Sequence, residues 1–330
     1  LGRQGYAEAP IGTGPFKVDT WKASSIALTA NRSSWHAPKL DRLEVIAVPD
    51  ISGRVQGLLS GRIDIAIGLG PDERLSVEAG GAVSKAWLDP SVAAISFVTV
   101  HGGPLADVRV RQALNYAVNK TAIIDNLFGG LTTPATQGVS HQAYGYNPDL
   151  QPYPYDPDKA RSLLKAANFP FDEEIVINVV PGAFPADSEI FQQTAADLTK
   201  VGLNVRVEVV PFGDWIKKFF PVAWPSAMWH NLWNAAPVMD ATTSILNQSC
   251  GKGGKPYLCD DTQQAMIDAA NSEFDPEKRK KILQDLIALQ YEEASNLYLI
   301  AYNNLHAYQS NVQGFRNVNQ VIMYHEMSLK

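Results

Sequence analysis

The sequence has few of the residues on which recognised catalytic and metal sites depend. Its 330 residues include two cysteines and six histidines, and the histidines lack the spacing of metal ligands. No nucleophile elbow of the Gly-x-Ser-x-Gly type, no His-Glu-x-x-His and no phosphate-binding Gly-Lys-Ser/Thr loop is present. These absences favour a binding protein over an enzyme, although a site assembled from distant residues would leave no motif.

Positive charge and long apolar runs are also scarce. Lys and Arg number 28 against 34 Asp and Glu, a net charge of −6, which argues against a nucleic-acid partner. No apolar run reaches the roughly 20 residues of a membrane-spanning helix. The 45% of hydrophobic residues suffices for sizeable cores, and the length of 330 residues favours two domains.

The two cysteines, Cys250 and Cys259, flank a Gly- and Lys-rich turn. A close pair in an otherwise cysteine-free chain indicates a local disulfide and an oxidising compartment. Two free buried thiols are the alternative. Two cysteines without a nearby histidine make only half of a zinc site, so we expect no metal and no cofactor.

The chain is organised around the stretch 93–130. Ile95–Val100 is an apolar run typical of a buried strand, and glycines at 102 and 103 with Pro104 interrupt it. Asp107 then offers an N-cap to one helix predicted to run to Phe128, and Gly129 ends it. The pattern fits a chain that leaves one lobe and enters another, or an ordinary strand–helix connection.

Two strand–helix–strand units are predicted on either side of this stretch. The first combines strands Leu43–Val48 and Ile63–Ile67 with a helix that Asp50 caps. The second combines strands Glu174–Val180 and Leu203–Val210 with a helix between them. Because such units form parallel sheets with right-handed connections, we expect two α/β sheets.

Further helices are expected to begin at Asp156-Pro157, at Asp261 and at Asp275-Pro276. The basic run Lys278–Lys281 in the last of these is interpreted as a solvated face.

The segment PLADVRVRQALNYAVNKTAII, residues 104–124, resembles the signature of the family 5 solute-binding proteins. These proteins are receptors of bacterial ABC importers for dipeptides, oligopeptides, nickel complexes and glutathione. The turn P-x-G-T-G-P-F near residue 12 and the pattern from Asp50 to Asp64 are similar to the same family. The resemblance extends from Pro10 to Phe315.

The resemblance implies an α/β, two-lobed class II periplasmic-binding-protein-like fold, with mixed sheets flanked by helices. Lobe one would comprise 1–98 with 300–330 and lobe two 99–299, linked by crossing strands Ile95–Val100 and Leu297–Asn303. It further implies a peptide-like or other small solute bound between the lobes, delivery to ABC permease subunits, a monomer when full length, and a periplasmic or extracellular location with or without a lipid anchor.

Family members are longer at the N-terminus. Because this sequence begins with Leu1 and shows no signal peptide, we expect a fragment or a processed product that lacks the first strands of lobe one and a small extra domain. Such a chain should expose a sheet edge or an apolar patch, unless a second copy covers it. The resemblance also implies a bridge between Cys250 and Cys259.

A solute pocket is expected in the aromatic stretches of lobe two. Peptide-binding members carry W-x-x-D, where the aspartate holds the amino terminus of the peptide; here Trp233 is kept but Ala236 replaces the aspartate. Asp240 could substitute, as in the glutathione-like branch, so ordinary dipeptides should bind poorly. The predicted pocket residues are Trp229, Asn231, Trp233 and Asp240, with His141 or Tyr144 opposite.

Each of these assignments has an alternative. The tryptophans could belong to the core and Asp240 could merely cap a helix. At the level of function, the rivals are a hydrolase acting in the same cleft and a chaperone-like or signalling module that binds protein partners.

Overall fold

The structure is a computed structural model of the whole chain, and it describes residues 11–181, 186–219, 228–236, 238–245, 258 and 260–330. The chain forms two compact units, Leu1–Trp87 with Asn304–Lys330, and Leu88–Asn303. Both changes of unit fall inside strands, the first in β5 (Val83–Phe97) and the second in β10 (Asn296–Tyr308).

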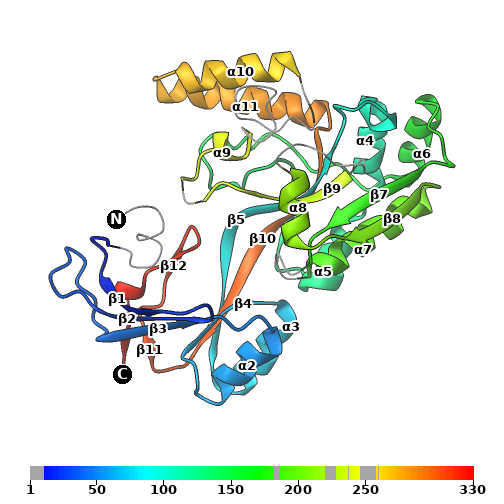
Figure 1. Cartoon of the computed structure of the whole chain (residues 1–330). Helices are drawn as coiled ribbons and strands as arrows, with labels where there is room; N and C mark the ends of the chain where they lie inside the picture. Colours follow the sequence, from blue (N-terminus) through cyan, green and yellow to red (C-terminus); the bar gives the residue numbers. More distant parts are fainter. Residues whose placement is uncertain (1–10, 182–185, 220–227, 237, 246–257, 259) are drawn as a thin grey trace. The chain divides into compact units, whose positions relative to one another are not determined.

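The smaller unit contains an antiparallel three-stranded sheet in the order β1-β2-β3 (Figure 1). Its strands are β1 (Phe16–Trp21), β2 (Ser25–Ala30) and β3 (Arg42–Ile46). Helices α2 (Ile51–Leu59) and α3 (Pro71–Ala79) pack on each other, and α2 packs on β4 (Ile65–Leu69). Short strands close the unit at the C-terminus: β11 (Val312–Gln313), β12 (Asn317–Val318), β13 (Val321–Ile322) and β14 (Ser328–Leu329).

The first predicted strand–helix–strand unit is wrong as a sheet unit. β3 pairs antiparallel with β2, whereas β4 pairs antiparallel with the end of β10, so β3 and β4 are not hydrogen-bonded neighbours. The reason is that the main-chain groups of β3 pair with the neighbouring strand β2, whereas those of β4 pair with β10, which lies far away in the sequence. The predicted helix between them is present, and Asp50 accepts a hydrogen bond from the amide of Gly53 at 2.6 Å.

The larger unit is built on strands in the order β10-β5-β9-β7-β8. β7 (Glu174–Val179) and β8 (Asn204–Val209) are parallel and joined by α7 (Asp187–Lys200), so the second predicted strand–helix–strand unit is confirmed. β9 (Met228–Asn234) pairs parallel with β7 and antiparallel with β5, and β6 (Thr133–Pro134) pairs with β10. The sheet is therefore mixed, as predicted.

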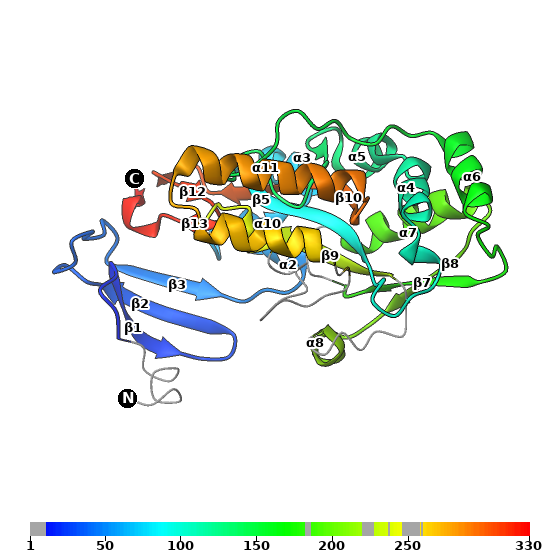
Figure 2. The same cartoon turned by 90° about the horizontal axis from the view of Figure 1, so that it is seen from above.

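Helices surround this sheet and bury its main core. The core lies among β5, β7, β10, α4 and α7, with Ile95, Phe97, Leu114, Ile177 and Phe191 fully buried. The helices are α4 (Val108–Ala117), α5 (Lys120–Phe128), α6 (Pro157–Ala166), α8 (Phe212–Phe219) and α9 (Thr242–Ile245), together with α10 (Asp261–Ser272) and α11 (Pro276–Glu292). The last two lie side by side (Figure 2).

The single helix predicted from Asp107 to Phe128 is wrong, because it is two helices. Asp107 caps α4 as expected, accepting from the amide of Arg109 at 2.8 Å. Val118 is extended, and the side chain of Asn119 accepts a hydrogen bond from the amide of Ala122 at 3.0 Å and starts α5. The preceding strand also ends earlier than predicted, at Phe97 instead of Val100.

Candidate functional site

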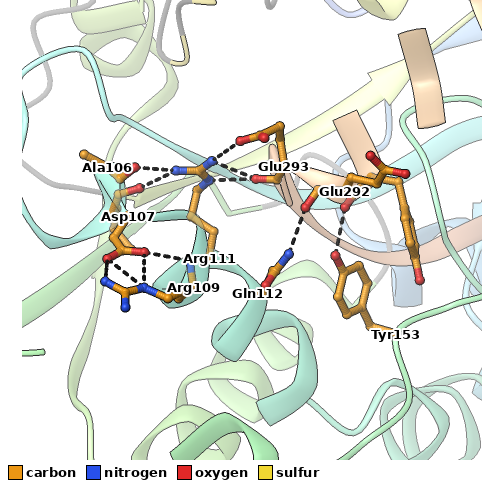
Figure 3. Close-up of polar contacts among 10 residues, drawn as sticks. Ala106, Asp107, Arg109, Arg111, Gln112, Tyr153, Glu292 and Glu293 are labelled. Carbon is orange, nitrogen blue, oxygen red and sulfur yellow. Dashed lines mark hydrogen bonds and ion pairs between the residues drawn. The ribbon is translucent and has the colours of Figure 1, made fainter. Parts of the chain in front are cut away.

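The signature segment supplies a buried guanidinium. The side chain of Arg111 on α4 is 4% exposed, and its Nη1 donates to the carbonyls of Leu105 and Ala106, each at 2.9 Å. On its other side, Nε and Nη2 donate to the carbonyl of Glu293 at 3.0 and 2.8 Å (Figure 3). Burial lowers the pKa of Arg111, and the nearby Glu293 carboxylate opposes that shift.

Two further side chains reach the same helix end. Gln112 donates from Nε2 to the carbonyl of Glu292 at 2.9 Å, and the Tyr153 hydroxyl donates to the carbonyl of Tyr291 at 2.8 Å (Figure 3). A helix leaves its last four carbonyls without intrahelical partners. At the end of α11, the consecutive carbonyls of residues 291–293 each accept a hydrogen bond from a side chain of α4 or of the loop at 131–156. The signature segment thus anchors α11, and we assign it a structural role.

The loop that carries Tyr144 is joined to the segment that carries Asp240. The amide of Tyr144 donates to the carbonyl of Met239 at 2.8 Å, and the amide of Ala241 donates to the carbonyl of Tyr144 at 2.9 Å. Gly145 has φ +90° and lies so close to α11 that an added Cβ would approach Leu283 and Ala241 to 2.9 and 3.0 Å. Only glycine suits this position, and it lets the loop pack against α11.

The Asp240 carboxylate lies in a network of charged and hydroxyl groups. Arg279 donates to it from Nη1 at 2.7 Å and from Nη2 at 3.2 Å. The amide and hydroxyl of Thr242, the first residue of α9, donate to Oδ1 at 2.9 and 2.6 Å, so Asp240 also contacts the start of α9. Burial of Asp240 opposes ionisation, but the hydrogen bonds from Arg279 and Thr242 outweigh it and lower the pKa of Asp240.

Tyr144 completes this group, which we call the Asp240 cluster: Tyr144, Asp240, Thr242 and Arg279. The Tyr144 hydroxyl donates to the carbonyl of Pro276, and the guanidinium carbon of Arg279 lies 5.3 Å from the Tyr144 ring centre. The prediction that the basic run Lys278–Lys281 is a solvated face is wrong for Arg279, whose side chain is only 21% exposed. Its carboxylate partner is 39 residues away in the sequence, so no local pattern could have indicated the pair.

Three of the predicted pocket residues, Trp229, Asn231 and Trp233, lie on β9, and of these the structure describes the side chain of Trp233. Trp233 is 2% exposed and packs with Val92, Ala135 and Tyr298. The backbones of Trp229 and Asn231 pair with those of Ser96 and Ala94, and their side chains lie outside the description.

Two more predicted positions complete the set. His141 is exposed, and its ring centre is 6.4 Å from that of Tyr146. The structure therefore brings Tyr144 and Asp240 together and leaves His141 outside the Asp240 cluster. Cys250 and Cys259 both lie outside the described residues, so their disulfide stays a prediction.

Within the described ranges, no group of three or more His, Cys, Asp or Glu could hold a metal ion. None of the described helices combines the length and the apolar character that crossing a membrane requires.

Comparison with known proteins finds clear relatives. Residues 2–255 match the family model of bacterial extracellular solute-binding proteins, family 5 Middle. The chain is 32% identical over 215 residues to heme-binding protein A of Haemophilus influenzae and 31% identical over 214 residues to the dipeptide-binding protein of Escherichia coli. It is 25% identical over 323 residues to the glutathione-binding protein GsiB of Salmonella choleraesuis.

The matched regions cover most of this chain and a smaller part of each relative. The match to heme-binding protein A covers 63% of this chain and 39% of that protein, and the match to the dipeptide-binding protein covers 63% and 40%. The match to GsiB covers 93% of this chain and 62% of GsiB.

Solved structures show the same fold. The binding protein DppA of Helicobacter pylori in complex with the peptide STSA has a TM-score of 0.82 at 23% identity, over 97% of this chain and 63% of that one. NikA of Brucella suis in complex with Fe(III)-EDTA has a TM-score of 0.85 at 22% identity, over 98% of this chain and 69% of the NikA chain. The predicted fold class, that of two-lobed periplasmic binding proteins, is therefore confirmed. The chain belongs to the bacterial extracellular solute-binding proteins of family 5.

Proposed function

We propose that this chain is the solute-binding part of an extracytoplasmic receptor that delivers a peptide-like or other small solute to an ABC permease. The observation that carries the proposal is the family match over residues 2–255. The curated relatives are named as binding proteins for heme, dipeptides and glutathione. On this proposal the two units are the lobes of the receptor, and the full-length protein acts as a monomer outside the cytoplasm, with or without a lipid anchor.

We further propose that the solute contacts the larger unit at Trp229, Asn231, Trp233 and Asp240, with His141 or Tyr144 opposite. Two observations support part of this set. Tyr144 forms main-chain hydrogen bonds with Met239 and Ala241, the neighbours of Asp240 in the sequence, and Trp233 lies on β9, in the strand that precedes Asp240. The Asp240 carboxylate already forms an ion pair with Arg279. A positively charged amino group of the solute would therefore bind a carboxylate that has one cationic partner, not an unpaired charge.

Thermal shift and calorimetry with defined probes test the receptor function. Reduced glutathione, heme and the dipeptide Ala-Phe represent the solutes in the relatives' names. A bound solute stabilises the folded state by mass action, so one probe should raise the melting temperature in a concentration-dependent way. The dipeptide should have the smallest effect, because Ala236 replaces the carboxylate of the peptide-binding pattern. Probe turnover without stabilisation would favour the hydrolase.

Paired variants test the pocket. Asp240→Asn keeps an acceptor for the Thr242 amide and removes the charge, and Arg279→Met removes the ion-pair partner and keeps the carboxylate. If Asp240 contacts the solute, Asp240→Asn should weaken binding of the active probe at least tenfold, and Arg279→Met should weaken it less. Trp233→Phe, which conserves most of the packing, should also weaken binding. Unchanged affinity in both Asp240→Asn and Trp233→Phe would overturn the pocket and leave the receptor function standing.

A further inference from the structure

The sheet of the larger unit ends in a strand with an open edge. In the described part of the chain β8 pairs with β7 alone, so it is the last strand of this sheet (Figure 1). The amide of Val210, directly after β8, donates to the carbonyl of Val179 on β7 at 2.8 Å. Because main-chain groups alternate in direction along a strand, those of Val205, Val207 and Val209 point away from β7. These outward groups can pair with an additional strand.

Two opposite charges lie on this edge strand, two positions apart. The side chains of Arg206 and Glu208 are 49% and 44% exposed. Arg206 donates from Nη1 to Glu208 and from Nε to Glu174 on β7, each at 3.2 Å. Among the residues that the structure describes, Nη2 of Arg206 has no acceptor, so the guanidinium has a donor left for one more carboxylate.

The sequence of β8 is complementary to itself in one antiparallel register. With a two-fold axis at Val207, the outward groups of Val207 bond to those of its counterpart, and Val205 of each copy bonds to Val209 of the other. Arg206 of each copy then lies opposite Glu208 of the other, at the positions where side chains of antiparallel strands come closest. An axis at Arg206 would instead place two guanidinium groups opposite each other.

The valines of β8 fit the same register. Val205 and Val207 are partly buried and pack against the main core, whereas Val209 is 61% exposed. In the joined sheet Val209 of each copy lies opposite Val205 of the other and on the same face, so its apolar surface becomes partly covered. The register therefore combines main-chain pairing, two ion pairs and burial of an exposed side chain.

We propose that the edge of β8 pairs with β8 of a second copy of this chain and so joins the sheets of two larger units. Charged residues on an edge strand oppose pairing with most other strands, and here they select this partner and this register. Because β8 has only 6 residues, the contact is much smaller than the interface of a stable dimer. We therefore expect a weak, reversible pairing with a dissociation constant of about 0.1–1 mM, and a monomer in dilute solution.

Sedimentation velocity with charge-exchange variants tests the proposal. Between roughly 10 µM and 1 mM the sedimentation coefficient of the wild type should rise with concentration. Arg206→Glu and Glu208→Arg should each weaken the association about tenfold, because each variant places like charges opposite each other. An equimolar mixture of the two variants should restore the association, since opposite charges face each other in the mixed pair. Lys217→Glu, at a 76% exposed side chain on α8, is the control and should associate as the wild type does.

Hydrogen–deuterium exchange locates the contact. The amides of Val205, Val207 and Val209 should exchange more slowly at the highest protein concentration than at the lowest. Val209→Pro removes an outward N–H and leaves the pairing with β7 in place, so it should weaken the association without changing the circular dichroism spectrum.

Three results would overturn the proposal. The first is a wild type that sediments as a monomer over the whole concentration range. The second is association of wild-type strength in both charge variants, which would mean that the copies meet at another surface. The third is a mixture of the two charge variants that associates no more strongly than either variant alone.

Discussion

The guanidinium of Arg111 and the main-chain carbonyl of Glu293 are joined by two hydrogen bonds although 182 residues separate them in the sequence. The contact fixes the end of α11 to the start of α4. It explains in physical terms why an Arg-Gln pair occurs in the signature segment: both side chains satisfy carbonyls that a helix end leaves open.

Arg111→Lys should lower the free energy of unfolding by about 2–3 kcal/mol. A lysine ammonium cannot donate at the same time to the carbonyls of Leu105, Ala106 and Glu293, which the planar guanidinium reaches. Urea unfolding followed by circular dichroism measures the change. Arg109→Lys is the control, since its side chain is 48% exposed and an exposed ion pair such as that with Asp107 contributes little to stability. Equal losses in the two variants would contradict the structural role of Arg111.

Local signals in the sequence predicted helix starts well. Asp50, Asp107, Asp156 and Asp275 were each expected to cap a helix, and each accepts a main-chain hydrogen bond in the first turn. A cap depends on a side chain and an amide two or three residues away, so the sequence contains the whole interaction. Asn119 is a cap of the same local kind, and it divides the segment that was predicted as one helix into α4 and α5.

Non-local pairing could not be predicted in the same way. The separation of β3 from β4 depends on β10, which arrives from more than 200 residues later in the chain. The pair of Asp240 with Arg279 and the contact of Arg111 with the C-terminal end of α11 could not be predicted either, because the partners come from distant elements. The network of contacts around Asp240 was therefore not predictable from the sequence, and the role of the predicted site residues in binding a solute stays a prediction.

Lys120 gives a prediction about pH. It is 4% exposed, and burial lowers its pKa from 10.5 to about 7. Between those two pH values the unfolded chain holds a proton that the folded chain lacks, so this residue's contribution to stability rises with pH, by at most about 1.4 kcal/mol per pH unit.

Lys120→Met should therefore unfold at higher urea concentration than the wild type at pH 7, and the difference should shrink toward pH 10. Unfolding curves at pH 7, 8.5 and 10 measure it. Lys217→Met is the control, because Lys217 is exposed and its variant should follow the wild type across the range. A constant difference between Lys120→Met and wild type at all three values would contradict the lowered pKa.

The Asp240–Arg279 pair gives a prediction for acid conditions. The pKa of Asp240 lies below its ordinary value of 3.8, so its ion pair stabilises the fold at neutral pH and is lost as the pH falls through the folded pKa. Arg279→Met should cost about 1 kcal/mol at pH 7, and its stability should converge with that of the wild type in acid. Urea unfolding at a series of pH values from 7 to well below 3 tests this; a loss of constant size over the whole series would contradict it.

The cysteine pair gives the last prediction. A bridge between Cys250 and Cys259 would close a loop of about ten residues, and the chain-entropy model assigns it roughly 2–3 kcal/mol of stabilisation. Reduction of the oxidised protein should lower its unfolding midpoint, and the Cys250→Ser, Cys259→Ser double variant should match the reduced wild type and be insensitive to reductant. Peptide mapping after alkylation identifies the bridge directly. Two alkylated cysteines in protein prepared under oxidising conditions would contradict the bridge, and a double variant as stable as the oxidised wild type would contradict its contribution.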